Sequence, residues 1–309
     1  MKRATVSIIV PIYNEQKCLP ELIRRLAALR EQTLEEFELG VILVDDGSTD
    51  QSRKMLRNFS KAHEWIDIRL LTRNFGHQIA VTAGMDIALT DYVVVIDGDL
   101  QDPPELIPAM LRQLINNGDH IVYGQRTVRD GDGKFKMWSA RLFYQMIRSW
   151  SHLDIPLDTG DFRVMTRRAR DILSEMREHS RFLRGMAPWT GLKSSGFLYA
   201  RDIRFAGTTH YTLGAMVNLA FSAIVSFSIT PLRAMQVLGL VVAIFGFMGL
   251  CASLLVAIFG SNAIGLGLLA SLNMMSTGVV VAALGIVGGY VHRIQDEVRG
   301  RPLYLIEEN

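Results

Sequence analysis

The sequence predicts an α/β domain with a mainly parallel, Rossmann-like sheet and helices on both faces, followed by a hairpin of two membrane-spanning helices. Short β-rich runs alternate with amphipathic segments up to about residue 125, a pattern typical of a parallel sheet covered on both sides. Within the 309 residues, no Asp, Glu, Lys or Arg occurs between Arg233 and Arg293. That stretch is roughly twice the ~20 residues that a helix needs to cross a bilayer, so it predicts two spans.

The predicted strands and helices of the head follow one another in strict alternation. Strands are expected at Val6 to Ile12, Val41 to Val44, Ile68 to Leu71, Tyr92 to Ile96 and Ile121 to Tyr123. Helices are expected at Leu19 to Leu29, Ser52 to Ala62, Gln78 to Leu89 and Pro104 to Asn116. Ligands of such sheets bind at the carboxyl ends of the strands, so the residues that follow each strand are the first candidates for a site.

Four segments are predicted along the chain. Residues 1–212 form the head, 213–231 form amphipathic interface helices, 232–292 form two transmembrane helices at about 233–259 and 265–291, and 293–309 form a tail. Within the head, Lys134 to Trp150 is basic and aromatic, which suits a helix that meets a membrane surface or an anionic ligand.

The charges beside the hairpin predict its orientation. Arginines lie on both sides of it, while the connecting loop has no charge: Arg201, Arg204 and Arg233 precede it, and Arg293, Arg299 and Arg301 follow it. By the positive-inside rule the head and both termini face the cytoplasm, so we expect a multi-pass protein of the inner (plasma) membrane. Only Cys18 and Cys251 are present, which argues against a disulfide framework. A net charge of +2 is too small to favour nucleic acid as a partner.

The strongest local signal is an acidic run after the apolar strand Tyr92 to Ile96. It reads Asp97-Gly98-Asp99-Leu100-Gln101-Asp102-Pro103-Pro104. Two carboxylates at positions i and i+2 can meet the same hard cation, and Mg²⁺ or Mn²⁺ is commonly bound by one or two carboxylates together with substrate phosphates. The alternative is a solvated acidic turn that caps the following helix. The other motifs favour the metal site.

Two weaker signals follow the first two strands. The acidic pair Asp45 and Asp46 precedes a Gly47 turn and can hold a nucleobase or ribose, although an ordinary strand-to-helix turn with Asp50 as N-cap is the alternative. Pro11-Ile12-Tyr13-Asn14-Glu15 can place an aromatic ring and a carboxylate beside a base. Neither G-x-x-x-x-G-K-[ST] nor G-x-G-x-x-G occurs, so metal and arginines would have to neutralise a nucleotide diphosphate. That combination suits a sugar nucleotide and argues against a dehydrogenase or kinase.

An ordered series of motifs extends over nearly the whole chain. Its members are Pro11-Ile12-Tyr13-Asn14-Glu15, Asp45-Asp46-Gly47-Ser48, Asn74-Phe75-Gly76, the acidic run at Asp97, Gly124-Gln125-Arg126, Asp158-Thr159-Gly160-Asp161-Phe162-Arg163, Phe182-Leu183-Arg184-Gly185, Arg204-Phe205-Ala206-Gly207 and Gly300-Arg301-Pro302-Leu303-Tyr304. Together they resemble family 2 glycosyltransferases with the A-type fold. The series is most similar to the dolichyl-phosphate mannose synthase branch, and within it to bacterial polyprenyl-phosphate (undecaprenyl-phosphate) glycosyltransferases with a C-terminal two-helix membrane anchor.

The resemblance implies roles for the matching residues. The nucleotide would be held by Pro11, Tyr13, Glu15, Asp45 and Asp46. Asp97 would contact the donor or the metal, and Asp99 with Gln101 would ligate Mg²⁺ or Mn²⁺. The candidates for binding the lipid phosphate or the diphosphate are Arg126, Arg141, Arg163 and Arg204. Asp158 or Asp161 could act as base or orient the acceptor, although a carboxylate near arginines is more often part of a structural ion pair.

The reaction that the resemblance implies is transfer of a single hexose, with inversion, from a nucleotide diphosphate sugar to undecaprenyl phosphate. UDP-glucose is the best guess for the donor, and the lipid-linked sugar would serve the modification of a surface glycan or polysaccharide. A phosphate monoester has its second pKa near ~6, so the acceptor is mostly a dianion at neutral pH and needs no strong base. Related enzymes also imply a homo-oligomer.

Three alternatives stay open. A processive polysaccharide synthase shares this type of head, but the chain has no Gln-x-x-Arg-Trp run, and two spans are too few to line a polymer channel. A catalytically silent membrane scaffold is the second, against which Asp97, Asp99, Gln101 and Arg163 speak. The third is a transferase that acts on a protein or a ceramide-like lipid.

Overall fold

The computed structural model describes residues 3–127, 159–179, 181–200, 230–259 and 262–307. They belong to two compact units, a head that includes the C-terminal segment Pro302–Asn309 and a unit of long helices. The predicted helix at Lys134 to Trp150, the head boundary at residue 212 and residues 213–229 of the predicted interface helices lie outside the described residues.

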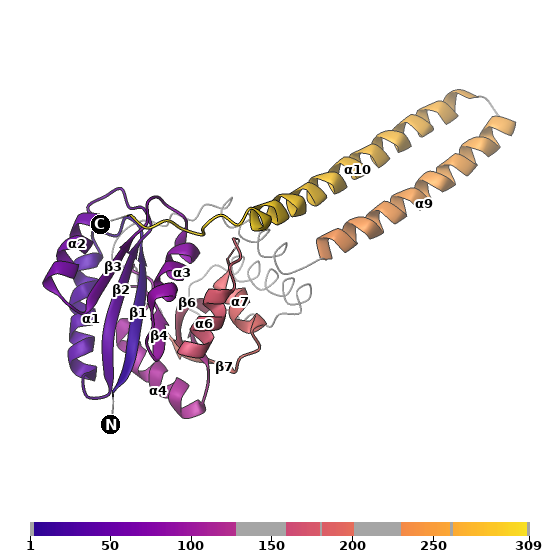
Figure 1. The fold of residues 1–309 in the computed structure, drawn as a ribbon. Coiled ribbons are helices and arrows are strands. Elements are labelled where there is room, and N and C mark those ends of the chain that lie inside the picture. The colour runs from indigo at the N-terminus through magenta and orange to yellow at the C-terminus, as the bar shows by residue number, and fades with distance from the viewer. Residues whose placement is uncertain (1–2, 128–158, 180, 201–229, 260–261, 308–309) are drawn as a thin grey trace. The chain divides into compact units, whose positions relative to one another are not determined.

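A seven-stranded sheet forms the centre of the head (Figure 1). In sheet order the strands are β3 (Ile66–Leu70), β2 (Phe37–Asp45), β1 (Ala4–Ile12), β4 (Tyr92–Val95), β6 (Thr159–Thr166), β5 (Ile121–Arg126) and β7 (Ser194–Tyr199). β6 runs antiparallel to β4 and β5, whereas the other neighbouring pairs are parallel. The predicted α/β architecture with a mainly parallel sheet is therefore confirmed.

Helices cover both faces of this sheet. They are α1 (Leu19–Thr33), α2 (Ser52–Ala62), α3 (His77–Ile87), α4 (Ile107–Asn117) after a 3-10 turn at Pro104–Leu106, α6 (Arg167–Glu175) and α7 (Leu183–Trp189). Apolar residues of α1, α2 and α4 join Ile8 and Val10 of β1 in one buried cluster. α3 packs on the opposite face, where Gly84 lies against Ile9. Successive strand residues point to opposite faces, and β1 is buried from Val6 to Ile12 with Ser7 as its one polar residue there, so both of its faces are covered.

β6, α6 and α7 lie in a part of the chain for which the sequence pattern predicts no regular element. β6 contains Asp161 and Arg163, which are only 4% and 3% exposed. Two ionisable residues break the apolar run that marks a buried strand. They can be buried because they pair, with Arg163 Nη2 3.5 Å from Asp161 Oδ1 and further partners described below.

The C-terminal segment pairs with the edge strand of the sheet. Ile306 forms an antiparallel bridge with Leu71, immediately after β3, and Glu307 N donates a hydrogen bond to Leu70 O at 2.8 Å. An unpaired sheet edge exposes backbone donors and acceptors, and this segment satisfies some of them. Part of the sequence-predicted tail is therefore integral to the head.

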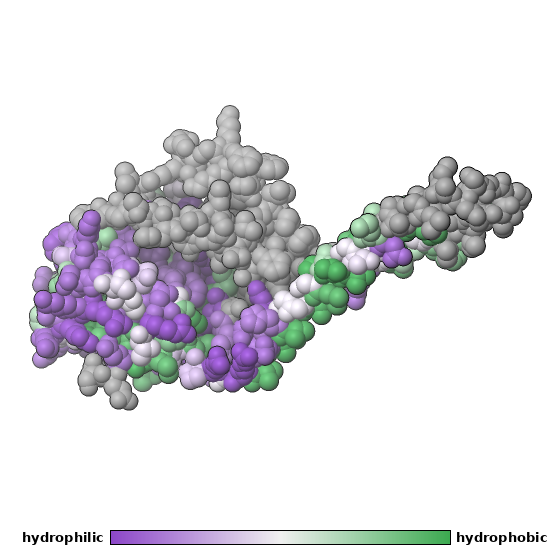
Figure 2. Space-filling model, turned by 90° about the horizontal axis from the view of Figure 1, so that it is seen from above, coloured by the Kyte–Doolittle hydropathy of each residue, from purple (hydrophilic) through white to green (hydrophobic). Residues whose placement is uncertain are grey.

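The second unit consists of α9 (Thr230–Phe259) and α10 (Asn262–Val298), which pack against each other. Their described side chains expose a largely apolar surface, drawn in green in Figure 2. Among the described residues, Leu272–Val298 is the one helical segment long and apolar enough to cross a membrane, and Met235–Gly249 is a shorter apolar segment. The two predicted spans fall within α9 and α10, but only one of them meets this criterion, so the two-span topology stays a prediction.

Candidate functional site

The acidic residues singled out in the sequence follow neighbouring strands of the sheet. Asp45 ends β2, and Asp97 lies shortly after the end of β4 at Val95. β1 runs between these strands, and its last residue, Ile12, pairs with Asp45. Pro11 is buried at the same level. The structure thus brings together three of the sequence motifs at the carboxyl edge of the parallel strands.

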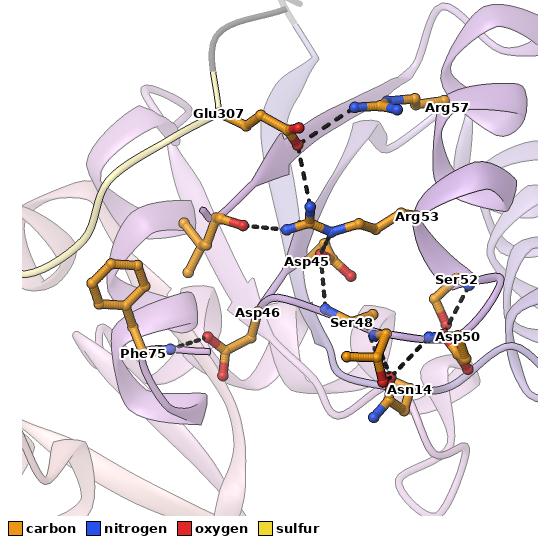
Figure 3. A network of polar contacts seen from close by, with 12 residues as sticks. Asn14, Asp45, Asp46, Ser48, Asp50, Ser52, Arg53, Arg57, Phe75 and Glu307 are labelled. Atoms are coloured by element: carbon orange, nitrogen blue, oxygen red, sulfur yellow. Dashed lines mark hydrogen bonds and ion pairs between the residues drawn. The ribbon is translucent and has the colours of Figure 1, made fainter. Parts of the chain in front are cut away.

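Asp45 is completely buried, with one carboxylate oxygen fixed by the protein (Figure 3). Its Oδ2 accepts hydrogen bonds from Ser48 N at 3.1 Å and from Arg53 Nε at 2.6 Å. Its Oδ1 is buried and accepts no hydrogen bond from the described residues. A buried carboxylate is costly unless it is paired, and Arg53 supplies the compensating charge. The hydrogen-bonding capacity of this second oxygen is thus left unused by the described residues.

Asn14 fastens the loop after β1 to the loop after β2. Its Oδ1 accepts a hydrogen bond from Thr49 N at 2.8 Å, and its N donates to Ser48 Oγ at 2.9 Å. Asn14 has a φ of 57°, a region that asparagine tolerates because its short side chain bonds locally. Next to it, Tyr13 is 47% exposed, so its ring is accessible to a ligand. Glu15 N donates to Ser52 Oγ at 3.1 Å, which ties the same loop to the start of α2.

Asp46 anchors the loop that leads into α3. Its Oδ1 accepts a hydrogen bond from Phe75 N at 2.7 Å, and its Oδ2 accepts one from Gly76 N at 3.0 Å. Burial raises the pKa of Asp46 above its ordinary value, while these two N–H groups oppose the rise. Both oxygens of Asp46 therefore have backbone partners, and the side chain serves first to hold this loop.

The loop after β4 is held in a strained conformation. Asp99 is 7% exposed, and its Oδ1 accepts a hydrogen bond from Gln101 N at 3.2 Å. Leu100 between them has a φ of 60°, which is unfavourable for a residue with a branched side chain and persists only where the surroundings fix it. Leu100 is itself buried at 2% exposed, so packing holds the conformation that presents Asp99.

Three side chains from separate elements form a group able to hold a metal ion. They are His77 at the start of α3, Asp97 after β4 and Asp161 in β6, and their ligand atoms all lie within 4.8 Å of one another. His77 Nε2 is 3.1 Å from Asp161 Oδ2 and 3.5 Å from Asp97 Oδ1. The group shares Asp97 with the acidic run but includes neither Asp99 nor Gln101, the ligands expected from the sequence.

The charges of this group depend on one another. Burial by itself would lower the pKa of His77, but the hydrogen bond to Asp161 and the charge of Asp97 raise it to about 9. Burial raises the pKa of Asp97 to about 6. Asp161 is also buried, yet the charge of Arg184 and the His77 hydrogen bond hold its pKa well below the ordinary value. At neutral pH His77 is therefore a cation, and a metal ion that bound it would have to displace its proton.

Asp161 gathers donors from several elements. Gln78 Nε2 donates to its Oδ2 at 3.0 Å, and Arg184 Nε donates to its Oδ1 at 3.1 Å. Arg163 donates to the backbone oxygens of Asp161 at 3.2 Å and of Leu183 at 3.0 Å. Through these hydrogen bonds Arg163 links β6 to α7, and its predicted contact with a lipid phosphate stays a prediction. Asp161, surrounded by cations, is correspondingly a poor general base.

Arg126, at the end of β5, is more accessible than Arg163. Its Nη2 is 3.6 Å from Asp102 Oδ2, its Nε lies 3.4 Å from Tyr199 Oη, and its side chain is 24% exposed. The Arg126 side chain is thus partly accessible, with its guanidinium held between Asp102 and Tyr199. The other predicted phosphate ligands, Arg141 and Arg204, and the predicted base Asp158 lie outside the described residues.

His77, Arg184 and Arg53 are site residues that the sequence did not single out for a function. From the sequence, His77 reads as a structural or surface residue because it has no second histidine at metal-ligand spacing. In the structure its partners come from β6 and from the loop after β4, which spacing along the chain cannot show. The Asn74-Phe75-Gly76 motif directly before His77 was the available signal for it, as Phe182-Leu183-Arg184-Gly185 was for Arg184.

Comparison with known proteins identifies relatives over almost the full length. A model described as Glycosyl transferase family 2 matches residues 7–173. The uncharacterized glycosyltransferase YkcC of Bacillus subtilis (strain 168) is 40% identical over 304 residues, which cover 98% of this chain and 93% of the relative. The bactoprenol glucosyl transferase of Shigella phage SfII is 32% identical over 305 residues, which cover 98% of both chains.

Similarity to a solved structure extends the comparison to the fold. Glucosyl-3-phosphoglycerate synthase from Mycobacterium tuberculosis, solved in complex with phosphoglyceric acid, gives a TM-score of 0.50 over 73% of this chain and 80% of the other. The two are 19% identical, so this likeness concerns the fold alone. Together with the family match, it confirms the predicted glycosyltransferase A-type fold.

Proposed function

Since the chain belongs to glycosyl transferase family 2, we propose that it transfers a single hexose from a nucleotide diphosphate sugar to a polyprenyl phosphate. The observation that carries the proposal is the convergence of the motifs of Asp45, Asp97 and Asp99 at the carboxyl edge of the parallel strands. The acceptor class follows from the bactoprenol glucosyl transferases that are similar to this chain over 98% of its length. UDP-glucose and undecaprenyl phosphate are the pair to test first.

A nucleotide is the ligand we assign to the ends of β1 and β2. We propose that Oδ1 of Asp45, which has no donor among the described residues, accepts a hydrogen bond from a base or ribose, and that the exposed ring of Tyr13 stacks on a base. Pro11 and Glu15 line the same loop. Asp46 supports the proposed nucleotide site indirectly, by accepting a hydrogen bond from Phe75 N and so holding the loop before α3.

Mg²⁺ or Mn²⁺ fits the loop after β4. Asp97 Oδ1 is buried and accepts no hydrogen bond from the described residues, and carboxylate oxygens with the Gln101 side chain are the donor set of a hard cation. We propose that Asp99 and Gln101 hold the ion and that Asp97 lies beside it. When bound, the ion would neutralise the negative charge that develops on the departing nucleotide diphosphate.

The acceptor phosphate needs to be oriented more than it needs to be deprotonated. A phosphate monoester with its second pKa near ~6 is mostly a dianion at neutral pH, so its oxygen can attack the anomeric carbon directly and invert it. We propose Arg126 for orienting such a dianion, because its side chain is partly exposed and its guanidinium forms an ion pair with Asp102. Arg141 and Arg204 are proposed for the same task. The low pKa and cationic partners of Asp161 argue for a positioning role and against its acting as base.

The proposal for the membrane goes beyond the one helical segment, among the described residues, that is long and apolar enough to cross a bilayer. We propose that α9 and α10 both cross the bilayer, with the head and both termini in the cytoplasm and the acceptor reached at the inner membrane face. The arginines on either side of the uncharged stretch between Arg233 and Arg293 support this orientation. We also propose that the chain forms a homo-oligomer.

The test is a transfer assay with detergent-purified protein, undecaprenyl phosphate, Mg²⁺ or Mn²⁺ and a panel of nucleotide sugars, read by mass spectrometry. We expect one donor to give a sugar-phosphate lipid with wild type and with Asp67→Asn, an exposed control on β3, but not with Asp99→Ala. Nucleotide binding without any lipid product would contradict the acceptor. A long glycan product would indicate a processive synthase instead.

A further inference from the structure

We infer that the C-terminal segment, residues 302–307, positions the nucleotide-binding carboxylate Asp45 through Arg53, with Glu307 as the positioning residue. The inference rests on the proposed function, because it takes Asp45 to be a nucleotide contact. It concerns a segment that follows α10 in the sequence and that none of the roles above uses.

The segment is built onto the head by contacts that do not involve the Glu307 side chain. These are the bridge of Ile306 to Leu71, the hydrogen bonds from Thr72 N to Leu305 O at 3.0 Å and from Glu307 N to Leu70 O at 2.8 Å, and that from Tyr304 Oη to Asp86 Oδ2 at 2.8 Å. The backbone of Glu307 is therefore fixed beside the end of β3. From this fixed position its side chain reaches one place on α2.

That place is the guanidinium of Arg53, which lies between two carboxylates (Figure 3). Arg53 Nε donates to Asp45 Oδ2 at 2.6 Å, and Arg53 Nη1 lies 3.3 Å from Glu307 Oε2. Arg53 Nη2 donates to the backbone oxygen of Leu71. Arg57 Nη2 lies 3.4 Å from the same Glu307 oxygen. All three nitrogens of the Arg53 guanidinium thus have acceptors, each from a different part of the chain.

This arrangement couples Glu307 to the orientation of Asp45. A guanidinium is planar, so acceptors on its three sides fix its plane and thereby the direction of the Nε–H that Asp45 accepts. Without Glu307, Arg53 keeps one carboxylate and one carbonyl and can turn within the space that opens. The carboxylate of Asp45, including the Oδ1 that has no partner among the described residues, would then adopt a wider range of orientations. Nucleotide affinity should fall, while the rate of the chemical step, which takes place at the other end of the donor, should change little.

The effect should be modest because Arg53 is 25% and Glu307 41% exposed at the side chain. Partly exposed ion pairs contribute little to stability or binding, so we expect Glu307→Gln to weaken UDP binding only roughly threefold. Glu307→Asp should recover part of that loss. Glu64→Gln, an exposed carboxylate shortly before β3, is the matched control and should bind UDP as wild type does.

The experiment measures UDP affinity by titration calorimetry and donor kinetics on full-length protein in detergent, with and without Mn²⁺. We expect a higher UDP Kd and donor KM in Glu307→Gln at unchanged kcat, and the same ratio of Kd values after EDTA because the effect arises away from the metal. In an Arg53→Gln background Glu307→Gln should have no further effect, whereas in Arg57→Gln it should retain one.

Each outcome bears on the inference. Equal UDP affinity in wild type and Glu307→Gln, or an effect that persists undiminished in Arg53→Gln, would overturn it and leave the proposed function intact. A threefold effect on UDP binding together with no sugar transfer to undecaprenyl phosphate would support the inference and refute the acceptor. Wild-type protein that binds no nucleotide at all would overturn both.

Discussion

His77 Nε2 lies 3.1 Å from Asp161 Oδ2, which joins the first residue of α3 to the antiparallel strand β6 across the site. Each residue stabilises the charged form of the other, since Asp161 raises the pKa of His77 and His77 helps to lower that of Asp161. The pair makes the stability of the head sensitive to pH in a range where most carboxylates have already ionised.

The first prediction concerns the pH dependence of unfolding without metal. The pKa of His77 rises from 6.5 to about 9 on folding, so the folded chain holds a proton that the unfolded chain releases. Its stabilising contribution is present in full below about pH 6.5 and is lost as the pH rises through about 9. In EDTA, the Tm of wild type should fall over this range, and the fall should be smaller in His77→Gln.

Thermal unfolding followed by tryptophan fluorescence between these pH values is the measurement. His63→Gln, which alters the residue after α2, should keep the wild-type slope. Addition of Mn²⁺ should flatten the wild-type slope if the ion displaces the His77 proton. Parallel Tm curves for wild type and His77→Gln would show that the pair does not control the pH dependence.

The second prediction concerns metal dependence. Asp99→Asn should lower sugar transfer about 100-fold or more, because a metal ion contributes several kcal/mol to stabilising a leaving group and each 1.36 kcal/mol is tenfold in rate. When the transfer rate is measured against Mn²⁺ concentration, the mutant should need more Mn²⁺ to reach half of its maximal rate. Its rate should be partly restored at high Mn²⁺. If Asp99→Asn transferred sugar at the wild-type rate at low Mn²⁺, the result would contradict Asp99 as a ligand and favour the group of His77, Asp97 and Asp161 as the metal site.

Patterns along the chain predicted the parallel half of the fold well and the second half poorly. β1, β2 and β4 are apolar runs followed by turns, and their motifs could be placed at a common edge from alternation alone. β6 could not be identified from the sequence because it contains Asp161 and Arg163. Gln78 and Arg184 pair with the buried Asp161, and backbone oxygens of β6 and Leu183 pair with Arg163. The partners that come from other elements are not revealed by a single sequence.

The third prediction concerns the close approach of two loops at Gly47. Gly47 has a φ of 73°, and a Cβ there would lie 2.3 Å from Asn74 N, a backbone atom that cannot turn away. Gly47→Ala should therefore lower the free energy of unfolding by about 2 kcal/mol or more, since a left-handed conformation alone costs about 1 kcal/mol in a residue with a Cβ.

Gly118→Ala is the control for this clash. Gly118 follows α4 with a φ of 63°, but a Cβ there meets nothing within 4 Å, so only the conformational cost applies. Comparison of the two Tm values by differential scanning fluorimetry isolates the steric contribution. Equal losses would mean that the loop of Asn74 adjusts, and nucleotide binding by Gly47→Ala should then be close to that of wild type.

The site was predictable where its residues directly follow strands, and not where residues of other elements hold them in place. Asp45 and Asp97 were selected from their position after strands, but Arg53, which holds Asp45, lies on α2 among other surface-type residues. Its role depends on Glu307, which is remote in sequence and reaches it through pairing at β3. Sequence motifs can therefore predict which residues belong to a site, but not the contacts with distant residues that hold them in position.

The last prediction separates Arg126 from Arg163, two of the four arginines that the sequence analysis named as candidates for phosphate binding. Arg163 is buried and donates to backbone oxygens of Gly160, Asp161 and Leu183, so Arg163→Lys keeps the charge but loses most of these bonds. Hydrogen bonds of charged groups contribute about 1.5–3 kcal/mol each, so stability should fall by about 2 kcal/mol or more, with the KM for lipid unchanged in the protein that remains folded. Arg126→Lys should do the reverse, because it removes a planar fork that is partly exposed. We expect its Tm to stay near that of wild type and its KM for undecaprenyl phosphate to rise about tenfold. A raised lipid KM in Arg163→Lys at wild-type stability would instead place that guanidinium at the acceptor.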